Sequence, residues 1–430
     1  MPLLSSLSTL ERQERVAFKS TEPLSRPPLP KKHGRPTGSG TAKSRTANSS
    51  KKMLASSLQR IPMSGSLPYF NDHDCVAVDD KGGKIYMFGG KRPGADDLCC
   101  DFNVCDARTM NWENWTNSFS REFSPSGPLP PLQNASATFL KIHSWRYVFL
   151  FGGYDGTDIN SQLIAINVNT KVWSVVPVEG TVAPRMDAAM VGIENRLYIF
   201  GGRQRFEHGS PNLNSYSVAE CTDAHWKWIC KDVPYPPHIP DLGFGGKALA
   251  VYGGKQVLLT AGRISTNVCI DMNPGNTVLF HCKHCTFQSA SQTEGVFPSG
   301  LHWYFAHTIE ASPPVSNPGP PTRGRKPIEF VPAPPPADPY AIICGWITSP
   351  YSINDSYLVP ELYRYKLPPV QEIECLDVKQ KLWELELDLQ SFIAVGRRLY
   401  MFGHDSDETD ANTVYTVCVE LDMQEMNLAG

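Results

Sequence analysis

Short runs of apolar residues, each ending in one or two glycines, recur along the chain. The clearest copies are residues 84–90 (KIYMFGG), 147–153 (YVFLFGG) and 197–202 (LYIFGG). Weaker copies end at Gly262, Gly345 and Gly403. Short runs of β-branched and aromatic residues that stop at glycine are typical of buried strands. The final glycines lie 49 to 83 residues apart, so the pattern predicts a repeated unit of roughly that size.

A second short apolar segment and a turn precede these runs. In the third copy, residues 188–193 lead through Glu194 and Asn195 into the run. In the first and fourth copies the turn holds a glycine pair, at residues 82–83 and 253–254. Glycine supplies the positive φ that tight hairpin turns need. The pattern therefore predicts an antiparallel hairpin at the start of each unit.

A polar loop, a third apolar segment and a tryptophan follow the three clear runs. The third segments are residues 101–106, 163–168 and 214–218. The tryptophans that come next are Trp112, Trp173, Trp226 and Trp228. Because no helical period runs through these segments, each unit is expected to hold four short antiparallel strands.

Four-stranded units repeated about every 50–60 residues are typical of β-propeller blades. In the order of their motifs the units resemble the kelch family. The residues that carry the resemblance are Asp106 and the motif residues Gly89, Gly90, Gly152, Gly153, Gly201, Gly202, Trp112 and Trp173. The resemblance implies an all-β fold, with a kelch-type β-propeller over residues 56–430. Six copies indicate six blades, and seven are the alternative.

Closure of the ring is predicted from the two ends of this region. The last copy ends in a third strand at residues 413–420, with no Trp-bearing fourth strand after it. Residues 57–61, with Pro62 and Gly65 after them, resemble the segment that follows Trp173. We expect residues 57–61 to complete the last blade, which would remove the open edge of the ring. The alternative is an unrelated leader beside an open last blade.

Charge is distributed unevenly. Residues 1–52 hold 11 Lys and Arg against three acidic residues, a net charge of +8, and the remaining 378 residues carry −11. Residues 20–50 consist mostly of Ser, Thr, Pro, Gly, Lys and Arg, so residues 1–55 are expected to form a disordered basic arm. The basic clusters fit a nuclear localisation signal, a phosphorylatable tether or a solvated leader. The acidic propeller is not expected to bind nucleic acid.

A proline-rich insertion interrupts the fifth copy. Residues 311–339 contain eleven prolines, together with the basic cluster at residues 323–326. Such a segment is extended or disordered and does not form a strand. Two interpretations stay open: a polyproline ligand for an SH3-like or WW-like module, or a tolerated surface loop.

Composition narrows the classes further. A membrane-spanning helix needs about 18 consecutive apolar residues, and no stretch of the sequence approaches this length. The sequence also has no apolar segment after a basic start, which a secretory signal would require. Several of the 12 cysteines fall on predicted strands, namely Cys75, Cys105, Cys269, Cys344 and Cys418. This placement favours buried free thiols in a reducing compartment, with a few disulfides as the alternative. We expect a monomeric cytoplasmic protein, with the nucleus as the alternative location.

Signals for metal binding and catalysis are weak. Residues 281–285 (HCKHC) resemble a metal cluster, but a zinc site needs further ligands and no second pair with this spacing occurs. The cluster is expected between the third and fourth strands of blade four, with Lys283 and His284 in the turn. Two types of enzyme resemble kelch propellers. One type has a galactose-oxidase-like copper site. The other type has an iron-binding motif, which is incomplete here because Phe392 stands where histidine is needed. No catalytic residue, cofactor or metal is therefore predicted.

Loops at the strand ends are the expected partner-binding region, because propellers present functional residues there. Residues just past each glycine run should occupy equivalent positions, and the resemblance adds an arginine before the third blade's first strand. The candidate partner-binding residues are Lys91, Arg92, Tyr154, Asp155, Arg185, Arg203, Arg205, Arg263, Trp346 and His404. Arg, Tyr and Trp dominate interface energetics, and Arg favours an acidic peptide. The sequence predicts a non-catalytic protein-interaction scaffold; the alternative is a metal-dependent oxidoreductase of the galactose-oxidase type.

Overall fold

The computed structural model describes residues 59–68, 75–91, 97–119, 127–206, 212–260, 262–265, 270–272, 277–288, 301–309, 340–348, 358–367, 373–376, 387–396, 398–405 and 416–422. All of them belong to the second of two units into which the chain divides, Lys51–Gly430. The predicted basic arm (residues 1–55) and the proline-rich insertion (residues 311–339) lie outside the described residues. Both stay predictions.

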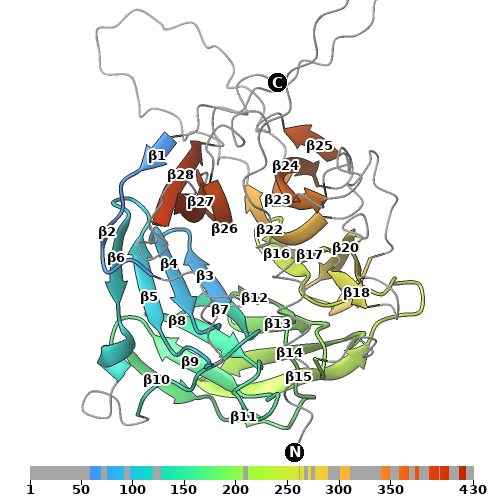
Figure 1. Ribbon diagram of the computed structural model, residues 1–430. Coiled ribbons are helices and arrows are strands. Elements are labelled where there is room, and N and C mark those ends of the chain that lie inside the picture. Colours follow the sequence, from blue (N-terminus) through green and yellow to red (C-terminus); the bar gives the residue numbers. More distant parts are fainter. Residues whose placement is uncertain are drawn as a thin grey trace, which may run out of the picture. The chain divides into compact units, whose positions relative to one another are not determined.

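Each of the first three sheets of this unit is built around four antiparallel strands (Figure 1). Sheet 1 holds β3 (Cys75–Asp79), β4 (Lys84–Phe88), β5 (Phe102–Asp106) and β6 (Asn111–Asn114), with the short β2 (Ser64–Gly65) beside β6. Sheet 2 holds β7 (Ser136–Ile142), β8 (Trp145–Phe151), β9 (Leu163–Asn167) and β10 (Val172–Val175). Sheet 3 holds β12 (Ala189–Ile193), β13 (Arg196–Phe200), β14 (Ser215–Thr222) and β15 (His225–Pro234), with β11 (Val178–Glu179) beside β15.

Three more sheets follow in chain order. Sheet 4 holds β16 (Lys247–Val251), β17 (Gln256–Thr260), β20 (Thr277–His281) and β21 (Thr286–Phe287), and β18 (Arg263–Ser265) pairs separately with β19 (Ile270–Met272). Sheet 5 holds β22 (Leu301–Ile309), β23 (Tyr340–Thr348), β24 (Leu358–Lys366) and β25 (Ile373–Leu376). Sheet 6 holds β26 (Leu387–Val395), β27 (Arg398–Asp405), β28 (Thr416–Asp422) and β1 (Gln59–Ile61). The predicted all-β fold is confirmed.

The described residues hold almost no helix. Within the described residues it consists of one 3₁₀ turn, η1 (Thr116–Phe119), whose Phe119 is fully buried. In this part of the chain no helix combines the length and apolar character that a membrane crossing requires.

The second strand of each of the first four sheets is buried on both faces. In β4, β13 and β17, every residue after the first is buried. A strand that is covered on both sides reads as a continuous apolar run, which explains why these segments stood out in the sequence. Hydrophobic clusters fill the space between adjacent sheets, for example between sheets 1 and 2 and between sheets 3 and 4.

Aromatic side chains join neighbouring sheets. The rings of Tyr86 in sheet 1 and Phe139 in sheet 2 are stacked, with centroids 6.0 Å apart. The ring of Trp112 in sheet 1 packs edge-on against Phe402 in sheet 6, at 5.8 Å. The latter contact joins segments that are nearly 300 residues apart in the sequence. It buries area that neither sheet could cover alone.

The first strands of the sheets contact one another in a closed order. The contacts run from β3 to β7, β12, β16, β22 and β26, and β26 contacts β3 again. This succession is a β-propeller arrangement. Hydrophobic clusters lie between sheets 1 and 2, 2 and 3, 3 and 4, 4 and 5, and 6 and 1.

The strand at residues 59–61 confirms the predicted closure. β1 pairs antiparallel with β28, with Arg60 opposite Val419, so the first described strand is the outer strand of the last sheet (Figure 1). Two short strands at the outer edges of sheets were not predicted. β2 and β11 each run parallel to the outer strand of a sheet, with Gly65 opposite Trp112 and Val178 opposite Trp226. Since β10 in sheet 2 leads directly into β11 in sheet 3, the chain links adjacent sheets at their outer edges.

Candidate functional site

Glycine pairs end the second strands of sheets 1, 2 and 3, and each pair fixes the loop that follows. The pairs have positive φ at both positions, for example 66° at Gly152 and 86° at Gly153. The amide of Gly152 donates to the Gln162 carbonyl in its own sheet at 3.1 Å, whereas that of Gly153 donates to the Arg185 carbonyl at 2.9 Å. Arg185 belongs to the loop before sheet 3. The glycine pair therefore turns the chain and joins two sheets.

The residue after each pair occupies the same place in its loop. Lys91 bridges to Leu98, Tyr154 to Ile159 and Arg203 to Asn212, each across its own loop. Tyr154 and Arg203 also bridge back to the loops before their sheets, at Gln133 and Met186. The structure therefore brings Lys91, Tyr154 and Arg203 to equivalent positions at one end of adjacent sheets.

The loops before the first strands form a second row at the same end. The amide of Asp187 donates to the Asn134 carbonyl at 2.9 Å, and that of Gly245 donates to the Asp187 carbonyl at 2.7 Å. Asn134, Asp187 and Gly245 have φ of 56°, 55° and 69°, respectively. Asn, Asp and Gly are the residue types that tolerate positive φ best. The row ties sheets 2, 3 and 4 together and gives the loop face a rigid frame.

Arg203 contacts side chains of two neighbouring loops on this face. Its Nε donates to Asp187 Oδ2 at 2.7 Å, and its guanidinium lies 4.4 Å from the centre of the Phe244 ring. Phe206 packs edge-on against Tyr154 at 5.0 Å. Loops of three sheets thus form one cluster of aromatic and charged side chains. The sequence did not reveal the roles of Asp187, Phe206 and Phe244, because they depend on contacts between loops.

Comparison with known proteins bears on which family forms this arrangement. Residues 50–254 match the model of the KLHDC2/KLHL20/DRC7 Kelch-repeats domain. The Rab9 effector protein with kelch motifs from Mus musculus is 30% identical over 180 residues, which cover 41% of this chain and 44% of that protein. Kelch domain-containing protein 3 from Rattus norvegicus is 26% identical over 210 residues, which cover 45% of this chain and 50% of that protein. The chain thus spans about half the length of these relatives.

Residues 50–254 are therefore a kelch-repeat region. The matched region covers sheets 1 to 3 and the first hairpin turn of sheet 4. These are the sheets with the clearest glycine pairs. The kelch assignment made from the order of glycine pair, third strand and tryptophan is confirmed.

Arg185, one of the candidate binding residues, lies in the interior of the kelch domain. It is fully buried. Its Nη1 donates to the Gly201 carbonyl at 3.1 Å, its Nε donates to the Ala183 carbonyl at 3.3 Å, and Nη2 pairs with the Asp232 carboxylate. Burial lowers the pKa of the guanidinium, which the Asp232 charge opposes. Arg185 therefore holds its loop on sheet 3 and does not present its charge to a partner.

The weaker kelch repeats place three other candidates in strands. Arg263 lies in β18 opposite Met272, Trp346 in β23 opposite Pro360, and His404 in β27 opposite Thr416. The expectation that these residues lie in loops was wrong. In β23 and β27 a single glycine takes part in the ladder, opposite Glu361 and Val417, so the strand continues where a glycine pair would have ended it. Arg92 lies outside the described residues.

Asp155, another candidate, caps its own loop. Its Oδ1 accepts hydrogen bonds from the amides of Thr157 and Asp158, both at 2.9 Å. Tyr154 keeps its hydroxyl in the same loop, donating to the Gly156 carbonyl at 2.7 Å. The loop after β8 is therefore rigid, and the aromatic ring of Tyr154 is the group it offers.

Charge on the described part of the loop face is mixed. The cations are Lys91, Arg203 and Arg205, and the carboxylates are Asp97, Asp101, Asp155, Asp158, Asp187 and Asp241. Arg205 is exposed, whereas Arg203 already pairs with Asp187. Among the candidate cations whose side chains the structure describes on this face, Arg203 is therefore ion-paired, Lys91 is partly buried and Arg205 is exposed.

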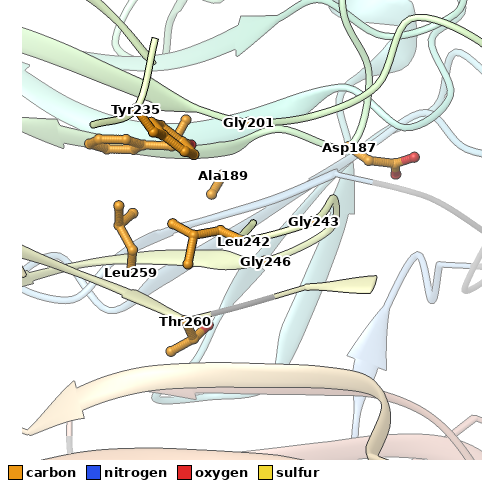
Figure 2. Close-up of a pocket in the computed structure, with 10 residues that line it drawn as sticks. Asp187, Ala189, Gly201, Tyr235, Leu242, Gly243, Gly246, Leu259 and Thr260 are labelled. Carbon is orange, nitrogen blue, oxygen red and sulfur yellow. The ribbon is translucent and has the colours of Figure 1, made fainter. Parts of the chain in front are cut away.

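A small cavity lies between sheets 3 and 4, lined by Phe200, Gly201, Tyr235, Leu242 and Leu259 among others (Figure 2). Its volume is about 10 Å³, roughly one water molecule. It is too small for an organic substrate. In the part of the chain that the structure covers, no three His, Cys, Asp or Glu side chains lie close enough to hold a metal ion. The Cys282–Cys285 segment forms the turn between β20 and β21, as the sequence predicted.

Proposed function

We propose that the chain is a six-bladed kelch propeller that binds a protein partner on the loop face carrying Lys91, Tyr154, Arg203 and Arg205, without catalysing a reaction. The closed succession of first strands supports six blades. The observation that carries the function is the rigid row of adjacent loops, which holds an aromatic and charged cluster at the end of sheets 1 to 4. Preorganised Tyr and Arg side chains supply most of the energy in protein interfaces.

The relatives support this proposal through the kelch repeats that they share with this chain. One of them is described as an effector of Rab9, a description that concerns that protein alone. The kelch domain is the part that this chain shares with it. For this chain, affinity purification of the full chain followed by mass spectrometry would identify the partner.

The charge of the partner is a second part of the proposal. We propose that the partner segment is acidic where it meets Lys91 and Arg205, because exposed Arg forms bidentate bonds to carboxylates or phosphates. The nearby carboxylates, Asp155 and Asp187 among them, disfavour a segment that is acidic throughout. Binding should therefore weaken as salt rises, although less than for a uniformly basic surface.

Charge reversal on the loop face tests the proposal. The double variant Lys91→Glu/Arg205→Glu is expected to weaken partner binding at least about tenfold, because two attractive contacts become repulsive. The dissociation constant is measured by calorimetry with the captured partner. Both side chains are at least partly exposed, so the fold should be unaffected.

The matched control is Lys141→Glu. Lys141 is exposed at the end of β7, next to the hairpin turn and at the opposite end of sheet 2 from Tyr154. This variant should bind as the wild type does. Equal affinity of the double variant and the wild type would overturn the proposed face, and a loss in the Lys141→Glu variant alone would move the site to the other end.

The alternative function, a metal-dependent oxidoreductase, makes a different prediction. The protein purified without added metal is expected to contain copper and iron in substoichiometric amounts by elemental analysis. Stoichiometric copper or iron that survives dialysis against a chelator would favour the oxidoreductase. No described contact favours that function.

We further propose that the protein works in the cytoplasm or the nucleus. Nine cysteines in the described part of the chain form no disulfide, and among them Cys75, Cys105 and Cys344 are buried as expected. Free thiols in this number suit a reducing compartment. Cell fractionation and imaging of the tagged chain test this proposal.

A further inference from the structure

The hydroxyl of Tyr235 is buried at the junction of sheets 3 and 4 and has no acceptor for its proton. Tyr235 follows β15, and its ring packs edge-on against Phe287 of sheet 4, with centroids 5.1 Å apart. The hydroxyl oxygen is shielded from solvent and makes no hydrogen bond within the described part of the chain. The nearby Gly201 amide already donates to the Ser215 carbonyl at 2.9 Å, and an amide N–H cannot accept a proton. Since a buried polar group without a partner costs free energy, this hydroxyl needs an acceptor.

The space beside this hydroxyl has the size of one water molecule. The cavity between sheets 3 and 4 is lined by Tyr235, Gly201 and Gly243, among others, and its volume is about 10 Å³ (Figure 2). A Cβ at Gly201 would lie 3.1 Å from the Gly243 carbonyl oxygen, 3.5 Å from the Tyr235 hydroxyl and 3.6 Å from the Leu213 carbonyl oxygen. Three polar oxygens therefore surround the space that the glycine leaves open. A buried water molecule typically makes about three hydrogen bonds.

The two preceding junctions of the ring close the same position with a direct hydrogen bond. The Gly90 amide of sheet 1 donates to the Leu132 carbonyl at 2.8 Å, and the Gly153 amide of sheet 2 donates to the Arg185 carbonyl at 2.9 Å. At the second of these junctions a Cβ at Gly152 would overlap the carbonyl oxygen of the next sheet. The backbones there are too close to admit a water molecule.

The third junction is more open at this position. Its corresponding groups are the Gly202 amide and the Gly243 carbonyl, and among the described residues no hydrogen bond joins them. The loop before sheet 4 fixes this separation from both sides. The Gly243 amide donates to Asp241 Oδ1 at 2.8 Å, and the Gly245 amide donates to the Asp187 carbonyl at 2.7 Å. The Gly243 carbonyl is thus held away from the amide that would otherwise bind it.

We propose that one water molecule is bound between sheets 3 and 4 as part of the native structure. It accepts a hydrogen bond from the Tyr235 hydroxyl and donates to the Gly243 and Leu213 carbonyls. The water thereby replaces the direct amide–carbonyl bond of the two preceding junctions. It also supports the loop that places Phe244 over the guanidinium of Arg203. Because the water contacts none of the residues proposed to bind a partner, either proposal can fail without the other.

A crystal structure of the full chain at about 1.5 Å resolution tests the site directly. We expect a single solvent peak about 2.7–3.0 Å from both the Tyr235 hydroxyl and the Gly243 carbonyl oxygen. The same peak should be missing or shifted in crystals of Tyr235→Phe. A direct hydrogen bond from the Gly202 amide to the Gly243 carbonyl, or no solvent peak beside the Tyr235 hydroxyl, would overturn the proposal.

Thermal unfolding of Tyr235→Phe gives a second readout. The substitution removes the hydroxyl and keeps the ring. If the hydroxyl binds water, the melting temperature should fall by about 2 °C, because one hydrogen bond is lost. A hydroxyl that is buried without a partner predicts the opposite, an unchanged or higher melting temperature.

The matched control is Tyr216→Phe. The Tyr216 ring packs against the same Phe287, with centroids 5.6 Å apart, and its hydroxyl donates directly to the Cys285 carbonyl at 2.9 Å. We expect the two variants to lose stability to a similar extent. A loss in Tyr216→Phe alone would contradict the water bridge, and the crystal structure of the wild type decides even if a variant fails to fold.

Discussion

Replacing Asp232 by asparagine is expected to lower the free energy of unfolding by about 3 kcal/mol. Its carboxylate is the charged partner of Arg185, whose side chain is fully buried. Asparagine keeps the size of the side chain and can still bond to Ser217, which donates to Asp232 at 3.1 Å. Asparagine also tolerates the φ of 45° found at this position. The variant therefore removes the counter-charge and one of the two acceptor oxygens, which now accept from Arg185, Ser217 and the Ala183 amide, and leaves the buried guanidinium with carbonyl partners alone.

The same substitution at Asp106 provides the matched control. Asp106 pairs with Lys84 at 2.9 Å, but both side chains are about one-third exposed, at 29% and 33%. Solvent screens this pair, so Asp106→Asn should cost less than about 1 kcal/mol. Urea denaturation of both variants, followed by tryptophan fluorescence, measures the difference. Equal losses would show that burial of Arg185 does not decide the energetics of its ion pair.

The loop that contains Arg185 explains why a sequence could not assign this residue. Arg185 follows Ala183 and Pro184 in a polar connection, which is typical of an exposed loop. Its partner lies 47 residues further on, where Lys231 and Asp232 together oppose Ser217 in a β-bulge of sheet 3. A bulge re-aims a side chain, and no local pattern announces it. Burial of the arginine thus depends on a long-range contact that periodicity cannot reveal.

The strands themselves were predictable because their signals are local. An apolar run covered on both faces, a glycine pair and a following tryptophan all lie within one sheet, as in residues 147–173. The outer strand β1 could be matched to β10 because the segments after both carry the same glycine position, at Gly65 and Gly180. β2 and β11 escaped prediction because two residues leave no alternation to read.

The sequence predicted the equivalence of some candidate positions but not the contacts that their side chains make. The glycine pairs identified Lys91, Tyr154 and Arg203 as equivalent residues, which the bridges at these positions bear out. The sequence gave no sign that Asp187 would neutralise Arg203 or that Phe244 would cover it, because these contacts join separate loops. The sequence of a single loop therefore predicts a basic surface, whereas the folded protein places acidic side chains of neighbouring loops beside the basic ones.

Replacing Gly152 by alanine is expected to destabilise the propeller by about 2–5 kcal/mol. Two costs combine. Alanine at a φ of 66° costs about 1–2 kcal/mol on its own. In addition, a Cβ at this position would overlap the Arg185 carbonyl oxygen and lie 3.3 Å from its carbonyl carbon. Relief of such overpacking typically costs a further 1–3 kcal/mol or so.

Gly253→Ala isolates the second cost. Gly253 has nearly the same φ, 65°, but a Cβ there would have no atom within 4 Å. This control should lose only the backbone cost of about 1–2 kcal/mol. Chemical denaturation of both variants gives the comparison, and equal losses would mean that the close approach between sheets 2 and 3 contributes nothing. A larger loss at Gly152 would show that the glycine pair is needed because the neighbouring sheet's backbone occupies the space of a side chain. Since that backbone belongs to Arg185, whose side chain is fixed by Asp232, the same residue would then anchor two sheets of the propeller.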